Sequence, residues 1–199
     1  MKTYEEFDAE VNQVYANAAD YGAVIQKLIP LANDGNPIAA FNMGCLYESG
    51  EHIEQSNANA LAYYVLADKL GLAEAKYQLG VTCEFGRCGV GQSHEVAAKI
   101  YQEAADLGHS NAQCQLGGLY ERGKGVEKNP ARAFHYYKLA SDSGNVRATF
   151  LLADSYMKGL GTSQSAYSAQ TGHSFHRKLV SDSTANWTVI PDQPDHFGA

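Results

Sequence analysis

The sequence of 199 residues predicts an all-α, right-handed solenoid of stacked helix pairs. Four alanines recur at intervals of 36, 37 and 36 residues: Ala39, Ala75, Ala112 and Ala148. Four glycines precede them at the same intervals: Gly35, Gly71, Gly108 and Gly144. A period of this length holds two helices, and stacked pairs bury a continuous core that no single pair could form alone.

The first helix of each period begins near the repeated alanine and has one buried face. Ala39, Met43, Gly44 and Tyr47 stand at i, i+4, i+5 and i+8, which is one side of a helix. The same face recurs twice: Ala75, Leu79, Gly80, Cys83 and Ala112, Leu116, Gly117, Tyr120. A glycine stands where each of these helices should end: Gly50, Gly86, Gly123 and Gly159. Glycine adopts the left-handed conformation of a helix C-terminus without strain.

The second helix of each period carries two small residues around a pair of large ones. The sets are Ala60, Tyr63, Tyr64, Ala67; Ala97, Ile100, Tyr101, Ala104; and Ala133, Tyr136, Tyr137, Ala140. Small residues let two helices approach closely, while tyrosines fill the space between them. Asn129 followed by Pro130 is a typical helix start.

Both ends depart from the repeat. Residues 1–36 are predicted to form an N-terminal capping helix pair over 4–33, in which Pro30 should kink or end the second helix. Residues 37–161 hold the repeats. Residues 162–199 are expected to contain a degenerate last helix and an irregular tail, which covers the last repeat or adds to a partner's binding surface.

Residues 112–144 read AxxxLGxxYExGxGVxxNPxxAxxYYxxAxxxG, and this pattern resembles the Sel1-like repeat family, relatives of the tetratricopeptide repeats. The resemblance implies an α-solenoid that binds proteins, as adaptors, signalling components or neutralisers of secreted bacterial proteins do. One cysteine-rich branch binds or hydrolyses beta-lactams. Its regular cysteine pair in every repeat is absent from this chain.

The composition bounds the choice of partner and compartment. Fifteen Lys and Arg stand against 22 Asp and Glu, for a formal charge of -7. This charge disfavours nucleic acid and anionic membranes as partners and favours a basic protein. No apolar stretch approaches the length of a membrane span, and no secretory signal is evident, so we expect a cytoplasmic protein with reduced cysteines.

Two rows of equivalent residues on the first helices are candidate partner-binding sites. Glu48, Glu84 and Glu121 could receive Lys or Arg side chains of a partner, or could be solvated helix formers. A second row holds Phe41, Tyr77, Cys114 and Phe150. These side chains either pack between repeats or, at Phe41 and Tyr77, anchor a partner.

No residue pattern indicates a cofactor, a metal or a catalytic centre. Cys83, Cys88, His94, His173 and His176 lack the spacing of a zinc site, and no phosphate-binding loop is present. The sequence therefore predicts a non-enzymatic scaffold or adaptor that binds a protein in a concave groove. A bacterial immunity protein that neutralises a toxin and a beta-lactam-binding hydrolase remain alternatives.

Overall fold

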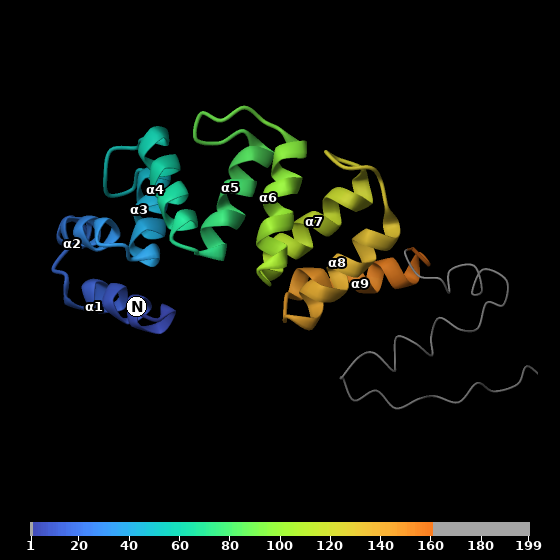
Figure 1. Ribbon diagram of the computed structural model, residues 1–199, viewed down its shortest axis with the longest axis horizontal. Coiled ribbons are helices and arrows are strands. Elements are labelled where there is room, and N and C mark those ends of the chain that lie inside the picture. Colours follow the sequence, from blue (N-terminus) through green and yellow to red (C-terminus); the bar gives the residue numbers. More distant parts are fainter. Residues whose placement is uncertain (1, 161–199) are drawn as a thin grey trace, which may run out of the picture.

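A computed structural model describes residues 2–160, which form an elongated array of helices (Figure 1). The helices within these residues are α1 (Tyr4–Asn17), α2 (Tyr21–Asn33), α3 (Pro37–Ser49), α4 (Asn57–Lys69), α5 (Ala73–Phe85), α6 (His94–Asp106), α7 (Ser110–Arg122), α8 (Pro130–Asp142) and α9 (Val146–Met157). The described range contains no strand, so the predicted all-α class is confirmed. The degenerate helix and tail expected over 162–199 lie outside the described residues.

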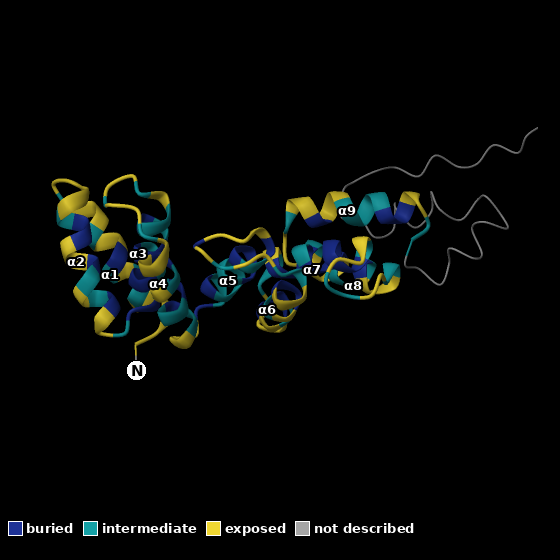
Figure 2. Ribbon diagram, turned by 90° about the horizontal axis from the view of Figure 1, so that it is seen from above, coloured by how far each residue is buried: buried dark blue, intermediate teal, exposed yellow. Residues whose placement is uncertain are grey.

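Each helix packs against the helix that follows it, and the contacts are most extensive within the pairs α3–α4, α5–α6 and α7–α8. The repeated small residues lie at these contacts, because Ala39, Ala60, Ala75, Ala97 and Ala112 are completely buried. Figure 2 shows the buried residues concentrated where neighbouring helices face each other. No helix within residues 2–160 combines the length and hydrophobicity that crossing a membrane requires.

The predicted helix boundaries agree with the capping geometry. Gly50, Gly86 and Gly123 end the first helices with φ of 68°, 68° and 67°, the left-handed conformation. Asn129 caps α8 by accepting a hydrogen bond from the Arg132 backbone N–H at 3.0 Å. These turns return the chain so that the second helix can pack on the first.

Of the two effects predicted for Pro30, a kink or an end of the helix, the second does not occur. The pair α1 and α2 lies within residues 1–36 as expected, but α2 continues past Pro30 to Asn33. Proline lacks a backbone N–H, yet its carbonyl still accepts a hydrogen bond, here from the Asp34 N–H at 2.8 Å. One lost bond near the end of the helix is therefore tolerated.

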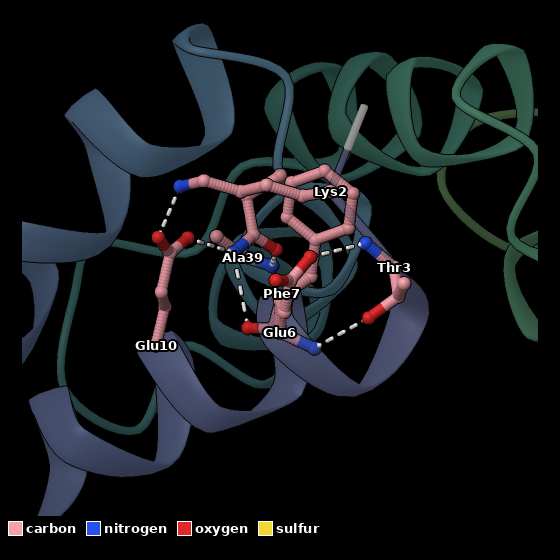
Figure 3. A network of polar contacts seen from close by, with 7 residues as sticks. Lys2, Thr3, Glu6, Phe7, Glu10 and Ala39 are labelled. Carbon is pink, nitrogen blue, oxygen red and sulfur yellow. Dashed lines mark hydrogen bonds and ion pairs between the residues drawn. The ribbon is translucent and has the colours of Figure 1, made fainter.

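The N-cap side chains of the first helices also connect successive repeats. Asn36 accepts hydrogen bonds from the Ile38 and Ala39 N–H groups at 3.0 Å through its oxygen. Its nitrogen donates to the Phe7 carbonyl at 3.1 Å and to Glu10 at 3.3 Å, both on α1. Figure 3 shows this network, in which Lys2 also pairs with Glu10. One buried amide thus caps α3 and holds α1 against it.

Two later N-caps repeat this arrangement with different chemistry. His109 accepts from the Ala112 N–H at 3.2 Å, which leaves its other ring nitrogen to bond Glu74 on α5 at 2.5 Å. Asn145 accepts from the Ala148 N–H at 2.9 Å and donates to Asn111 on α7 at 2.7 Å. Each side chain therefore ties the start of one first helix to the start of the preceding one.

The junction between α3 and α5 is apolar instead. Leu72 stands at the N-cap of α5 without a side-chain hydrogen bond, and Ile38 occupies the position that Glu74 and Asn111 hold on later helices. Both side chains are buried in the same hydrophobic cluster. Leu72 and Ile38 show that where the N-cap residue is apolar, the position before the repeated alanine on the preceding first helix is apolar as well.

Candidate functional site

The predicted glutamate row is built into a contact that recurs in three repeats. On each first helix a glycine stands four residues before the glutamate, and a tyrosine of the second helix lies over that glycine. The tyrosine hydroxyl donates to the glutamate: Tyr64 to Glu48 at 2.6 Å, Tyr101 to Glu84 at 2.8 Å and Tyr137 to Glu121 at 2.8 Å. We call this arrangement the Gly–Tyr–Glu contact.

The glycine is required because the tyrosine ring occupies the space of a side chain. A Cβ atom at Gly44 would lie 2.6 Å from the Tyr64 ring, and one at Gly80 would lie 2.5 Å from the Tyr101 ring. At Gly117 the distance to the Tyr137 ring would be 2.7 Å. Tyr64, Tyr101 and Tyr137 are also the largest fully buried side chains among the described residues. The predicted close helix contact at these glycines is confirmed.

Each glutamate of the row makes a hydrogen bond inside the solenoid. Glu84 is only 6% exposed, because it lies against the second helix of its own repeat. Glu48 is half-buried and also contacts Gln78 at 3.2 Å and Arg87 at 3.7 Å. The main contact of each carboxylate is inside the solenoid, while a role of Glu48, Glu84 and Glu121 in partner binding stays a prediction.

The three tyrosines of the Gly–Tyr–Glu contacts should keep their protons until the protein unfolds. Burial, and then the hydrogen bond to the adjacent glutamate, raise the pKa of Tyr64, Tyr101 and Tyr137 well above the ordinary value. An unfolded chain releases these protons near pH ~10, so stability should be complete below that pH and fall as the pH rises further.

An alkaline titration checks this expectation. Absorbance of tyrosinate and helical circular dichroism are followed together, and part of the signal from the 13 tyrosines should appear only as helix is lost. Ionisation of all tyrosines in a chain that remains fully helical would contradict it.

The aromatic row combines packing with partial exposure. Phe41 is half-buried, with its ring centroid 5.7 Å from that of Tyr64. Tyr77 is half-buried between Tyr101 at 5.8 Å and the His109 ring at 4.8 Å. Phe41 and Tyr77 are therefore partly accessible, while their role in binding a partner stays a prediction.

The other two members of the row diverge. Cys114 is 3% exposed, and Phe150 is 72% exposed on the last described helix. Tyr156, also on α9, is buried, with the Phe134 ring edge-on at 5.0 Å.

The sequence analysis did not predict the N-cap connections, because a helix-capping residue does not by itself indicate a second partner on the preceding helix. The register contains the necessary signal: Asn36, Leu72, His109 and Asn145 each stand three residues before the repeated alanine. Polar residues with both a donor and an acceptor at that position can cap one helix and reach another.

The described residues offer little for chemistry. Within residues 2–160, no three His, Cys, Asp or Glu side chains gather in a way that could hold a metal ion. The four cysteines, Cys45, Cys83, Cys88 and Cys114, are unpaired thiols. Burial raises the pKa of each of these thiols, which keeps them protonated and weakly nucleophilic.

Paired helices, repeated contacts and one-dimensional stacking define the class of this protein as an α-helical repeat solenoid. The sequence matches the Sel1 repeat over residues 37–71, 73–109, 110–145 and 146–170. The chain belongs to the Sel1 repeat family.

Among curated proteins, the chain is similar to human protein sel-1 homolog 2, with 34% identity over 140 residues. This match covers 70% of the chain but only 20% of the human protein. The chain thus spans about a fifth of the length of this relative.

Two solved structures share the architecture. A protective antigen of uropathogenic Escherichia coli with the same repeat fold is 25% identical, with a TM-score of 0.70, over 91% of this chain and 41% of its own. An immunity protein of Pseudomonas aeruginosa is 23% identical, with a TM-score of 0.55, over 76% of this chain and 58% of its own. At 23% identity, the similarity to the immunity protein shows a shared fold and nothing about function.

Proposed function

We propose that this chain is a non-enzymatic scaffold or adaptor that binds a basic partner protein. The observation that carries the proposal is the uneven distribution of charge along a repeat solenoid. Residues 1–75 hold 11 Asp and Glu against three Lys and no Arg, whereas residues 76–160 hold eight acidic and ten basic residues. Because opposite charges steer association, the basic surface of the partner would meet the half built from α1 to α4.

The half-exposed aromatic residues supply the other component of such a surface. Phe41 lies in the acidic half and Tyr77 just beyond it, and rigid aromatic side chains contribute much of the energy of protein interfaces. We infer that these two residues line the concave side, where the acidic half engages the partner. The same proposal places the scaffold in the cytoplasm, where its thiols stay reduced.

Charge-neutralising variants test the polarity of the surface. The partner is captured from the native organism with the full chain, purified, and its binding is measured at several salt concentrations. Glu51→Gln with Glu54→Gln, both exposed in the acidic half, should weaken binding and flatten its salt dependence. The matched control is Glu95→Gln with Glu127→Gln, which removes the same charge from exposed positions of the other half. Equal effects of the two pairs would contradict an acidic-half interface.

A second candidate function is an immunity protein that neutralises a cognate toxin by covering it. The acidity of residues 1–75 favours this reading too, because a basic toxin would be complementary. A gene for a toxin beside this one, and protection of cells that co-express both, would favour immunity over an adaptor. Beta-lactam hydrolysis is the least supported alternative, and a chromogenic substrate screen addresses it.

A further inference from the structure

The third repeat concentrates positive charge around the turn between its two helices, which is drawn in yellow after α7 in Figure 1. Four of the ten basic residues of 76–160 stand within residues 122–132, at the end of α7, in the turn and at the start of α8. All four side chains are exposed. We call them the basic turn, and its members are Arg122, Lys124, Lys128 and Arg132.

The fold does not require these charges, because the first repeat makes the same turn without them. Both turns begin at a glycine in the left-handed conformation, Gly50 or Gly123. Both close with a backbone hydrogen bond from the N-cap residue of the second helix to a tyrosine carbonyl of the first, at 3.0 and 2.9 Å. At the four positions of the basic turn the first repeat has Ser49, Glu51, Gln55 and Asn59. One carboxylate in that repeat thus corresponds to four cations in the third.

None of the four cations is neutralised by a carboxylate within residues 2–160. The basic residues that form ion pairs there are Lys2, Lys76, Arg87, His109, Lys138 and Lys158. Glu127 is the only acidic residue of 122–132, and the neighbouring Glu121 accepts the hydroxyl proton of Tyr137. Like charges that lie together without a counter-charge favour the binding of a partner of opposite sign.

The path of the turn brings the two lysines beside Arg122. A Cβ atom at Gly123 would lie 3.0 Å from the Cβ of Lys128, so this lysine stands next to the residue between Arg122 and Lys124. The turn is also held from the outside. Gly125 has no room for a side chain, because the backbone of His94 at the start of α6 lies directly against it.

The fourth cation is oriented by an aromatic residue. The guanidinium of Arg132 donates a hydrogen bond to the Tyr120 hydroxyl at 2.9 Å and lies 5.3 Å from the centre of that ring. Tyr120 is buried, and its ring stacks on that of Tyr136 with centroids 5.8 Å apart. An oriented guanidinium on a fixed turn loses less entropy when a ligand binds.

We propose that the basic turn binds a short acidic segment of a partner protein, rich in aspartate and glutamate. A guanidinium pairs with carboxylates in a defined geometry, and the lysines add charge without a fixed direction. A long polyanion such as nucleic acid fits less well, because the whole chain carries a formal charge of -7 and repels it beyond the turn. This surface is opposite in charge to the acidic half and goes beyond the function proposed above, so either can fail without the other.

A fluorescein-labelled peptide of alternating glutamate and glycine tests the basic turn in the full chain. Its binding is measured by fluorescence anisotropy at several salt concentrations. Lys124→Gln with Lys128→Gln should weaken binding about fivefold and flatten its salt dependence, because two of the four charges are lost. The matched control is Lys27→Gln with Lys69→Gln, which removes the same charge from exposed positions of the acidic half. Glu127→Gln should strengthen binding, because it removes the carboxylate that competes with the peptide.

Several results would overturn the proposal. The peptide could fail to bind at low salt, or the two lysine pairs could weaken its binding equally. An oligonucleotide of the same charge that binds more tightly than the peptide would assign the surface to nucleic acid instead. Self-association of the chain that Lys124→Gln with Lys128→Gln abolishes, measured by sedimentation, would assign the surface to a second copy.

Discussion

Replacing Gly117 by alanine should destabilise the protein by about 2 kcal/mol, although the same substitution usually stabilises a helix. The added Cβ would lie 2.7 Å from the Tyr137 ring and 3.2 Å from the Ala133 carbonyl. The ring is fully buried and held by its hydroxyl at Glu121, so it cannot turn aside. Helices α7 and α8 must therefore move apart, which weakens the packing along the whole pair.

Gly118→Ala is the matched control, because the substitution is the same, one residue later on the same helix. The nearest atoms to a Cβ there would be those of the Arg122 guanidinium, from 3.0 Å, the far end of a flexible side chain. Thermal or urea unfolding of the two variants should therefore separate them clearly. Similar stabilities would mean that the close approach of α7 and α8 is not what requires Gly117.

Tyr101→Phe should cost about 2 kcal/mol, because it leaves the buried Glu84 carboxylate without its hydrogen-bond donor. The loss should be smaller for Tyr137→Phe, since Glu121 is half-buried and water can replace the hydroxyl. Chemical denaturation of both variants gives the comparison.

A second substitution distinguishes the lost hydrogen bond from lost packing. Glu84→Met introduces the residue type that α9 has at this position, where Met157 stands. Combined with Tyr101→Phe it should recover much of the stability, because no polar group is then buried without a partner. A double variant as unstable as the sum of the single ones would show that the hydroxyl and the carboxylate contribute independently.

The stacking architecture could be predicted from the sequence because periodicity records it directly. The alanine and glycine intervals gave the helix pairs, and the aromatic positions of the second helices gave the buried tyrosines Tyr64, Tyr101 and Tyr137. The continuation of α2 past Pro30 was not predictable in the same way, because it depends on how near the helix end the missing N–H falls.

The candidate site was less predictable for a physical reason. Repetition of Glu48, Glu84 and Glu121 is equally compatible with a partner's positive charges and with a tyrosine hydroxyl of the same repeat. A one-dimensional pattern gives the position on the helix but does not say which side chain of the second helix reaches it. Only the packed geometry identifies Tyr101 as the group that the buried Glu84 contacts.

The N-cap connections make the order of the repeats part of the fold. His109 bonds the carboxylate of Glu74, whereas Leu72 and Ile38 are buried in one hydrophobic cluster. A gene duplication or deletion that joined the Ile38 repeat directly to the His109 repeat would bury an imidazole against an aliphatic side chain. Deletion or duplication of a repeat should therefore be tolerated best where the residues that meet at the new junction are both polar or both apolar.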